Sequence, residues 1–235
     1  MVGTNGYSFK VTICDLKAWA TSQVPSLCFH GAWHPNAGPA LLFTRQRVNR
    51  RRDFSIYHSP FTIHPMLGRP HPNEAASYYS LYIDRVPSDD VVGVLTTQLE
   101  EAVDFLSEIS EQQSLHRYAP DKWSMRELLG HVNDTERVFM FRALWFARGF
   151  QDPLPSFDQE IGFKAAESDN VSWASHVAEF SAIRSATLAF FRNLPSDAWL
   201  RSGIASDNSV TVRALAYIVA GHVAHHLAIL RERYL

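Results

Sequence analysis

The stretch TVRALAYIVAGHVAHHLAILRER, residues 211–233, decides the fold. Its apolar residues recur at alternating steps of three and four, the period of one face of an α-helix. Two histidines occupy positions on this face that are otherwise apolar. Because burying a polar ring without a partner costs free energy, both histidines need a partner inside the protein. The face consists of Val212, Leu215, Val219, His222, His226 and Ile229.

His222 and His226 are one helical turn apart, and their side chains differ by about 40° around the helix axis. Both rings can therefore share one cation, and a nitrogen from a facing helix would complete a three-ligand face with open positions. His131 is the candidate, because it follows Leu128 by three on its own helical segment. Two alternatives remain: an interior histidine can be a hydrogen-bonded core residue, and His225 could pair with His222 instead. We prefer His226 because it lies on the apolar face.

Four helical segments of roughly 20 residues each predict an all-α four-helix bundle. The first follows Pro87-Ser88-Asp89-Asp90, and the second opens at Ser124 with Glu127 three residues later, a capping-box pattern. The third spans about residues 172–193 and the fourth begins near Thr211. We expect loops elsewhere, and no alternation is strong enough to predict a sheet. Arg213 and Tyr217 lie off the apolar face of the fourth helix, so we expect them at its rim or in solvent.

The overall composition is that of a soluble globular protein, with 46% hydrophobic and 20% charged residues. The net charge of −2 shows no bias toward nucleic acid or acidic membrane surfaces. No apolar run reaches the roughly 18 residues of a membrane span, and no secretory signal precedes the first segment. We therefore expect a cytoplasmic protein with no nucleic-acid or membrane partner. Cys14 and Cys28 lack metal-site or catalytic spacing.

The chain divides into two unlike parts. Residues 1–65 carry seven Lys and Arg against two Asp and Glu and show no sustained period, which predicts a basic, disordered extension. Residues 66–235 are acidic overall and contain the predicted bundle. An arginine cluster in the extension could be a nucleic-acid patch, but a solvated segment is the simpler interpretation. The alternative predicts salt-dependent DNA binding that is lost when residues 1–65 are deleted. The cluster consists of Arg45, Arg47, Arg50, Arg51 and Arg52.

Two acidic residues follow His131 on the second helix. Asp134 is one turn further along on about the same face, so it is a candidate catalytic residue that could orient an imidazole or accept a proton. Glu136 is about 140° around the helix from His131. We therefore interpret Glu136 as a solvated or capping carboxylate. Neither a G-x-S-x-G motif nor a cysteine occurs in residues 66–235.

Two segments resemble the DinB-like superfamily, in its DinB/YfiT branch. The first is Tyr118-Ala-Pro-Asp-Lys-Trp-Ser124 with the helix that follows it as far as Arg137, and the second is Val212–Leu230 with its His-x-x-x-His. The resemblance covers about residues 75–235. It implies crossover connections between the helices and a divalent cation, usually nickel, zinc or iron, held by His131, His222 and His226. Residues 1–65 match nothing in the superfamily.

The resemblance implies two types of chemistry. Some members look like low-molecular-weight-thiol S-transferases, in which the metal would bind the cofactor thiol and favour its thiolate form. Others are described as metal-dependent hydrolases, in which the metal activates a water. We therefore predict a metalloenzyme acting on a small-molecule substrate, with a low-molecular-weight thiol as one candidate partner. The alternative is a non-catalytic, metal-stabilised bundle that serves in homodimer formation or ligand binding.

Overall fold

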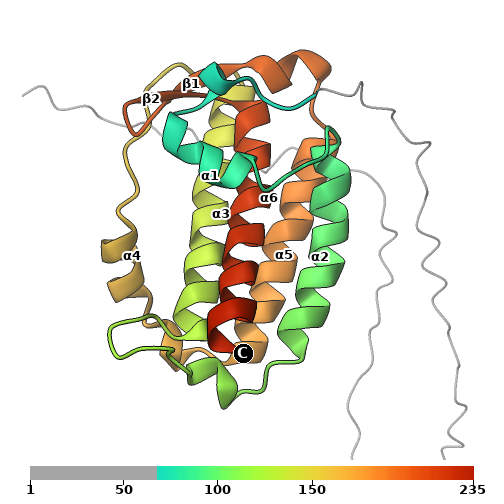
Figure 1. The fold of residues 1–235 in the computed structure, drawn as a ribbon. Helices are drawn as coiled ribbons and strands as arrows, with labels where there is room; N and C mark the ends of the chain where they lie inside the picture. Colours follow the sequence, from blue (N-terminus) through green and yellow to red (C-terminus); the bar gives the residue numbers. More distant parts are fainter. Residues whose placement is uncertain (1–67) are drawn as a thin grey trace, which may run out of the picture. The chain divides into compact units, whose positions relative to one another are not determined.

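The computed structural model describes residues 68–235, which form a bundle of four long helices (Figure 1). The predicted all-α four-helix bundle is confirmed. The predicted extension at residues 1–65, with its arginine cluster, lies outside the described residues. The long helices are α2 (Val91–Ser107), α3 (Met125–Ala147), α5 (Trp173–Arg192) and α6 (Val212–Ile229).

Each long helix begins where a short polar side chain caps it. In every case the side-chain oxygen of the residue before the helix accepts a hydrogen bond from a backbone N–H in the first turn, which satisfies a donor that the helix itself cannot. At α3 the Glu127 side chain also accepts from the N–H of the capping residue at 2.7 Å, so the predicted capping box is confirmed. The four capping residues are Asp90, Ser124, Ser172 and Thr211.

The helices are not arranged around the bundle in chain order. Helix α3 packs against α5 and α6, and α2 packs against the same two helices, so α2 and α3 lie diagonally opposite each other. Helices α3 and α5 run in the same direction (Figure 1), so the connection between them returns along the length of the bundle. The implied crossover connections are therefore present, and they place α3 beside α6.

Four short elements, two strands and two helices, lie where no regular structure was predicted. Strands β1 (Ser202–Ala205) and β2 (Asn208–Thr211) form an antiparallel hairpin, with Ser206 and Asp207 at its turn in the left-handed region. Strands of four residues are too short for an alternating pattern to be detected. Helix α4 (Gln159–Ala166) begins after Asp158, which caps it. Helix α1 (Ser80–Ile83) lies against α6.

The remaining elements are single turns. The 3-10 turns are η2 (Pro72–Glu74), η3 (Ser77–Tyr79), η4 (Gln113–Leu115), η5 (Ser168–Asn170) and η6 (Ser196–Leu200), and a π-helical turn, η7 (Leu230–Tyr234), continues α6.

Helix α6 is covered on nearly every side, and this makes the expectation for Arg213 and Tyr217 wrong. Both side chains are buried, because α1 and the segment before it cover the face of α6 that was expected to meet solvent. The guanidinium of Arg213 pairs with the buried Glu74 carboxylate, and the Tyr217 hydroxyl donates to the Ser88 carbonyl at 2.9 Å. The run Val212–Tyr234 is long and apolar enough to cross a membrane, but 78% of its most apolar stretch is buried inside the bundle.

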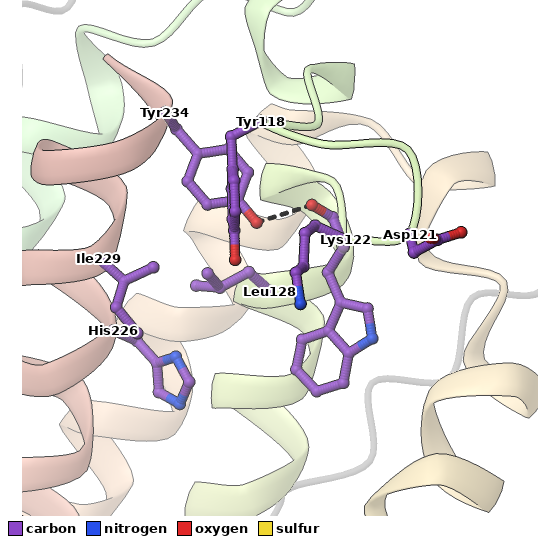
Figure 2. Close-up of a pocket in the computed structure, with 8 residues that line it drawn as sticks. Tyr118, Asp121, Lys122, Leu128, His226, Ile229 and Tyr234 are labelled. Atoms are coloured by element: carbon purple, nitrogen blue, oxygen red, sulfur yellow. Dashed lines mark hydrogen bonds between the residues drawn. The ribbon is translucent and has the colours of Figure 1, made fainter.

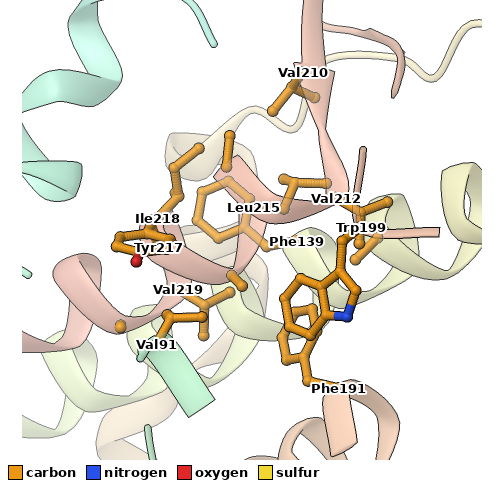
Figure 3. Packing of buried hydrophobic residues seen from close by; sticks show 14 of the residues in the cluster. Val91, Phe139, Phe191, Trp199, Val210, Val212, Leu215, Tyr217, Ile218 and Val219 are labelled. Carbon is orange, nitrogen blue, oxygen red and sulfur yellow. The ribbon is translucent and has the colours of Figure 1, made fainter. Parts of the chain in front are cut away.

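The main apolar cluster surrounds the first half of α6 (Figure 3). Trp199 of η6 stacks on Phe191 of α5 at 5.3 Å between ring centroids and is fully buried, so η6 closes this end of the bundle. Phe139 of α3 belongs to the same cluster and contacts His222 at 6.0 Å between ring centroids. The apolar core therefore extends to the histidines.

A charged network crosses the core, which makes the interpretation of Glu136 as a solvated carboxylate wrong. Glu136 is 2% exposed and accepts two hydrogen bonds from the guanidinium of Arg184, at 2.9 and 2.8 Å, and one from Thr187 at 2.8 Å. Arg184 also donates to Gln98 of α2, whose amide donates to the Ala220 carbonyl of α6. The network joins all four long helices beside the histidines.

Candidate metal centre

The fold brings the three predicted histidines together. The Nε2 atom of His222 lies 3.2 Å from Nε2 of His131 and 3.1 Å from Nε2 of His226. One nitrogen from each ring falls within a group in which all atoms are within 4.8 Å of one another. Two nitrogens come from α6 and one comes from α3, as the spacing predicted. His225, the histidine next to His226 in the sequence, is not part of this group.

Burial keeps these rings neutral. It lowers the pKa of His131 to about 4, and burial together with the neighbouring His131 lowers the pKa of His226 to about 3. His222 is 3% exposed, and burial, followed by the charges of its histidine neighbours, holds its pKa well below the usual value. Each ring is therefore neutral near neutral pH and has one nitrogen lone pair that a cation could bind.

The three nitrogens do not satisfy one another. A neutral imidazole has one N–H donor and one acceptor nitrogen, and Nε2 of His222 takes part in both close contacts. That atom can donate or accept, but it cannot complete two hydrogen bonds in the ring plane. A cation would bond to all three lone pairs at once, and three imidazoles suit several divalent metals. The donor set therefore fits a divalent metal ion.

Glycine at position 221 lets another element approach the site. A Cβ atom at Gly221 would lie 1.9 Å from the carbonyl oxygen of Tyr82, so only glycine allows α1 to lie this close to α6. The ring of Tyr82 then meets the edge of His222 at 5.1 Å between centroids, and meets His225 at 5.6 Å. The α1 segment thus closes one side of the histidine group.

The structure places a different residue beside His131 from the one predicted. The Oγ1 atom of Thr135 lies 3.3 Å from Nδ1 of His131, on the ring edge away from the other histidines. Asp134 instead contacts Arg137 of the same helix at 3.5 Å, and its side chain is 42% exposed. The catalytic role of Asp134 stays a prediction. Thr135 could have been found from the sequence, since it follows His131 by four residues, the spacing that pairs the two histidines of α6.

An aromatic cavity of about 260 Å³ opens beside His226 (Figure 2). Trp123 lines it, contacts the ring of His131 at 5.0 Å, and stacks on Phe163 of α4 at 5.0 Å between centroids. In the sequence Trp123 belongs to the segment that resembles the superfamily, but no helical period predicts its contact with His131. The other lining residues are Tyr118, Asp121, Lys122, Leu128, Ile229 and Tyr234.

The comparisons with known proteins agree with this fold. The family model of the DinB superfamily matches residues 95–230, which include α3, α6 and all three histidines, and the chain belongs to that superfamily. None of the curated proteins matches the chain.

Among the solved structures that match is one of a bacterial protein. It is YfiT from Bacillus subtilis, described as a probable metal-dependent hydrolase with an unusual four-helix bundle topology. The likeness has a TM-score of 0.54 at 17% sequence identity, and it covers 71% of this chain and 92% of YfiT. At this identity it supports the shared fold, including the arrangement of the four helices.

Proposed function

We propose that the protein is a divalent-metal-dependent enzyme in which His131, His222 and His226 hold the metal. The convergence of three neutral, wholly or partly buried ring nitrogens from two helices carries this proposal. Membership of the DinB superfamily and the description of YfiT as a probable metal-dependent hydrolase support it. Nickel, zinc and iron are the candidate metals.

A divalent cation at this site would supply Lewis acidity, which lowers the pKa of a water or a thiol for attack on an electrophile. The residues of the chain hold the ligands in place: Thr135 positions the His131 ring, and Tyr82 and Phe139 pack against His222. Trp123 and the other aromatic residues of the cavity form the wall beside His226. The open side of the site, lined by His226, is where a substrate would enter.

Metal content tests the proposal directly. Elemental analysis of purified protein should find about one divalent ion per chain in the wild type and a large loss in the His222→Ala/His226→Ala variant. His225→Ala is the matched control, because its ring is adjacent but lies outside the three-nitrogen group. Equal metal in the double variant and the control would contradict the proposal.

Activity assays separate the two chemistries from the non-catalytic alternative. Metal-loaded protein is incubated with a panel of esters and amides, and separately with an electrophile plus a low-molecular-weight thiol. Turnover that the double histidine variant lacks would assign a hydrolase or an S-transferase. Metal-dependent melting without turnover in either arm would favour a metal-stabilised binding module.

A further inference from the structure

Two hydrogen-bond donors point into the aromatic cavity beside His226 (Figure 2). They are the amine of Lys122 and the hydroxyl of Tyr118. Within residues 68–235, neither atom has a hydrogen-bond or ion-pair partner. The carboxylate of Asp121, the residue before Lys122, points away from the amine (Figure 2). The cavity is therefore lined by one positive charge and one neutral hydrogen-bond donor that contact no acceptor among the described side chains.

Two arginines of the same region, Arg117 and Arg126, are already paired with carboxylates, in contrast to Lys122. The guanidinium of Arg117 contacts the carboxylates of Glu127 and Asp169, and it also donates to the Lys122 carbonyl at 2.9 Å. Arg126 is buried and pairs with Glu111. The bond from Arg117 fixes the backbone of the segment at Lys122, and the exposed Lys122 side chain extends from it at the mouth of the cavity.

Apart from Asp121 and His226, the rest of the lining is aliphatic or aromatic. Leu128 and Ile229 form one part of the wall, and Tyr234 closes another, with its hydroxyl donating to the Trp123 carbonyl at 2.7 Å. Tyr118 and Tyr234 pack edge to face at 4.9 Å between ring centroids. A ligand that fills about 260 Å³ of this space must therefore have an apolar or aromatic body.

We propose that this cavity binds a small organic carboxylate, with its apolar body against the aromatic wall and its carboxylate on Lys122 and Tyr118. One ammonium and one hydroxyl match the single charge and two oxygens of a carboxylate. The carboxylate of Asp121 also lines the cavity and repels a doubly charged phosphate more than a singly charged carboxylate, so we favour the carboxylate. This proposal rests on the proposed function in one respect: His226 lines the same cavity, so a bound carboxylate would lie beside the metal.

Calorimetric titration of the full chain tests this proposal. Phenylacetate is the probe, and phenylacetamide is its uncharged counterpart of nearly the same shape. We expect phenylacetate to bind metal-free wild-type protein and Lys122→Gln to weaken it by about tenfold or more, since hydrogen bonds to charged groups are the stronger ones. Phenylacetamide should bind more weakly and respond little to the substitution.

Lys164→Gln on α4 is the matched control, because it removes the same charge from outside the cavity lining. Equal affinities for the acid and the amide, or equal effects of Lys122→Gln and Lys164→Gln, would overturn the proposal, as would Lys122-dependent binding of phenyl phosphate tighter than that of phenylacetate. Thermal melting of each variant checks folding. Because the first titrations use metal-free protein, a failure of the metal proposal would leave phenylacetate binding intact, so the two failures are distinguishable.

Discussion

The buried pair Glu136–Arg184 provides the sharpest test of how this bundle is held together. Arg184 is fully buried and Glu136 is 2% exposed, and the guanidinium and carboxylate share two hydrogen bonds of 2.9 and 2.8 Å. Glu136→Gln keeps the size of the side chain but removes its charge, which leaves the guanidinium buried without a counter-charge. Breaking a buried ion pair in this way costs about 3–5 kcal/mol.

Urea unfolding measures this loss. If the free energy of unfolding falls by about 2 kcal/mol per molar of urea, the urea concentration at the unfolding midpoint should fall by about 1.5–2.5 M. The control is Asp197→Asn, which removes the charge from an exposed pair with Arg201 at 2.6 Å, where the side chains are 69% and 39% exposed. That change should alter the free energy of unfolding by less than about 1 kcal/mol.

A double variant separates the charge effect from packing. Replacing Glu136 by Leu together with Arg184 by Met removes both charges, so most of the stability lost in Glu136→Gln should return. If Glu136→Gln and Asp197→Asn destabilise the protein equally, the network does not carry the energy that its burial implies, and the reasoning is refuted.

Gly221→Ala should destabilise the protein by about 1–3 kcal/mol, because the new methyl group would lie 1.9 Å from the Tyr82 carbonyl oxygen and must displace α1. Urea unfolding measures this loss. An unchanged unfolding midpoint would contradict the close approach of α1 to α6. Metal-free protein should lose stability as the pH falls from about 6.5 toward 4, because His131 and His226 have folded pKa values of about 4 and 3 while the unfolded chain binds protons near 6.5. Unfolding measured at several pH values should show this slope, and the His222→Ala/His226→Ala variant should show a shallower one. Ser124→Ala removes the cap of α3 and should cost about 1 kcal/mol by the same unfolding assay, with no loss of metal; a loss of metal would mean that the cap also positions the site.

The sequence determined the local features of this protein. Helix starts follow from single capping residues such as Ser124, whose hydrogen bonds reach only three positions along the chain. The spacing of His222 and His226 fixes their relation, because a helix places residues four apart on one stripe. His131 could be matched to them because its position on an apolar face predicts that it points inward.

Only the tertiary structure decided which residues are buried around α6 and which side chains support the histidines. The periodic pattern assumes that a helix has one solvent face, but α6 is covered by α1 as well as by the long helices, so Arg213 and Tyr217 are buried. Glu136 is buried because Arg184, 48 residues further along the chain, supplies its counter-charge. Such partners lie far apart in sequence, and their contact depends on how the crossover connections arrange the helices, which no local period encodes.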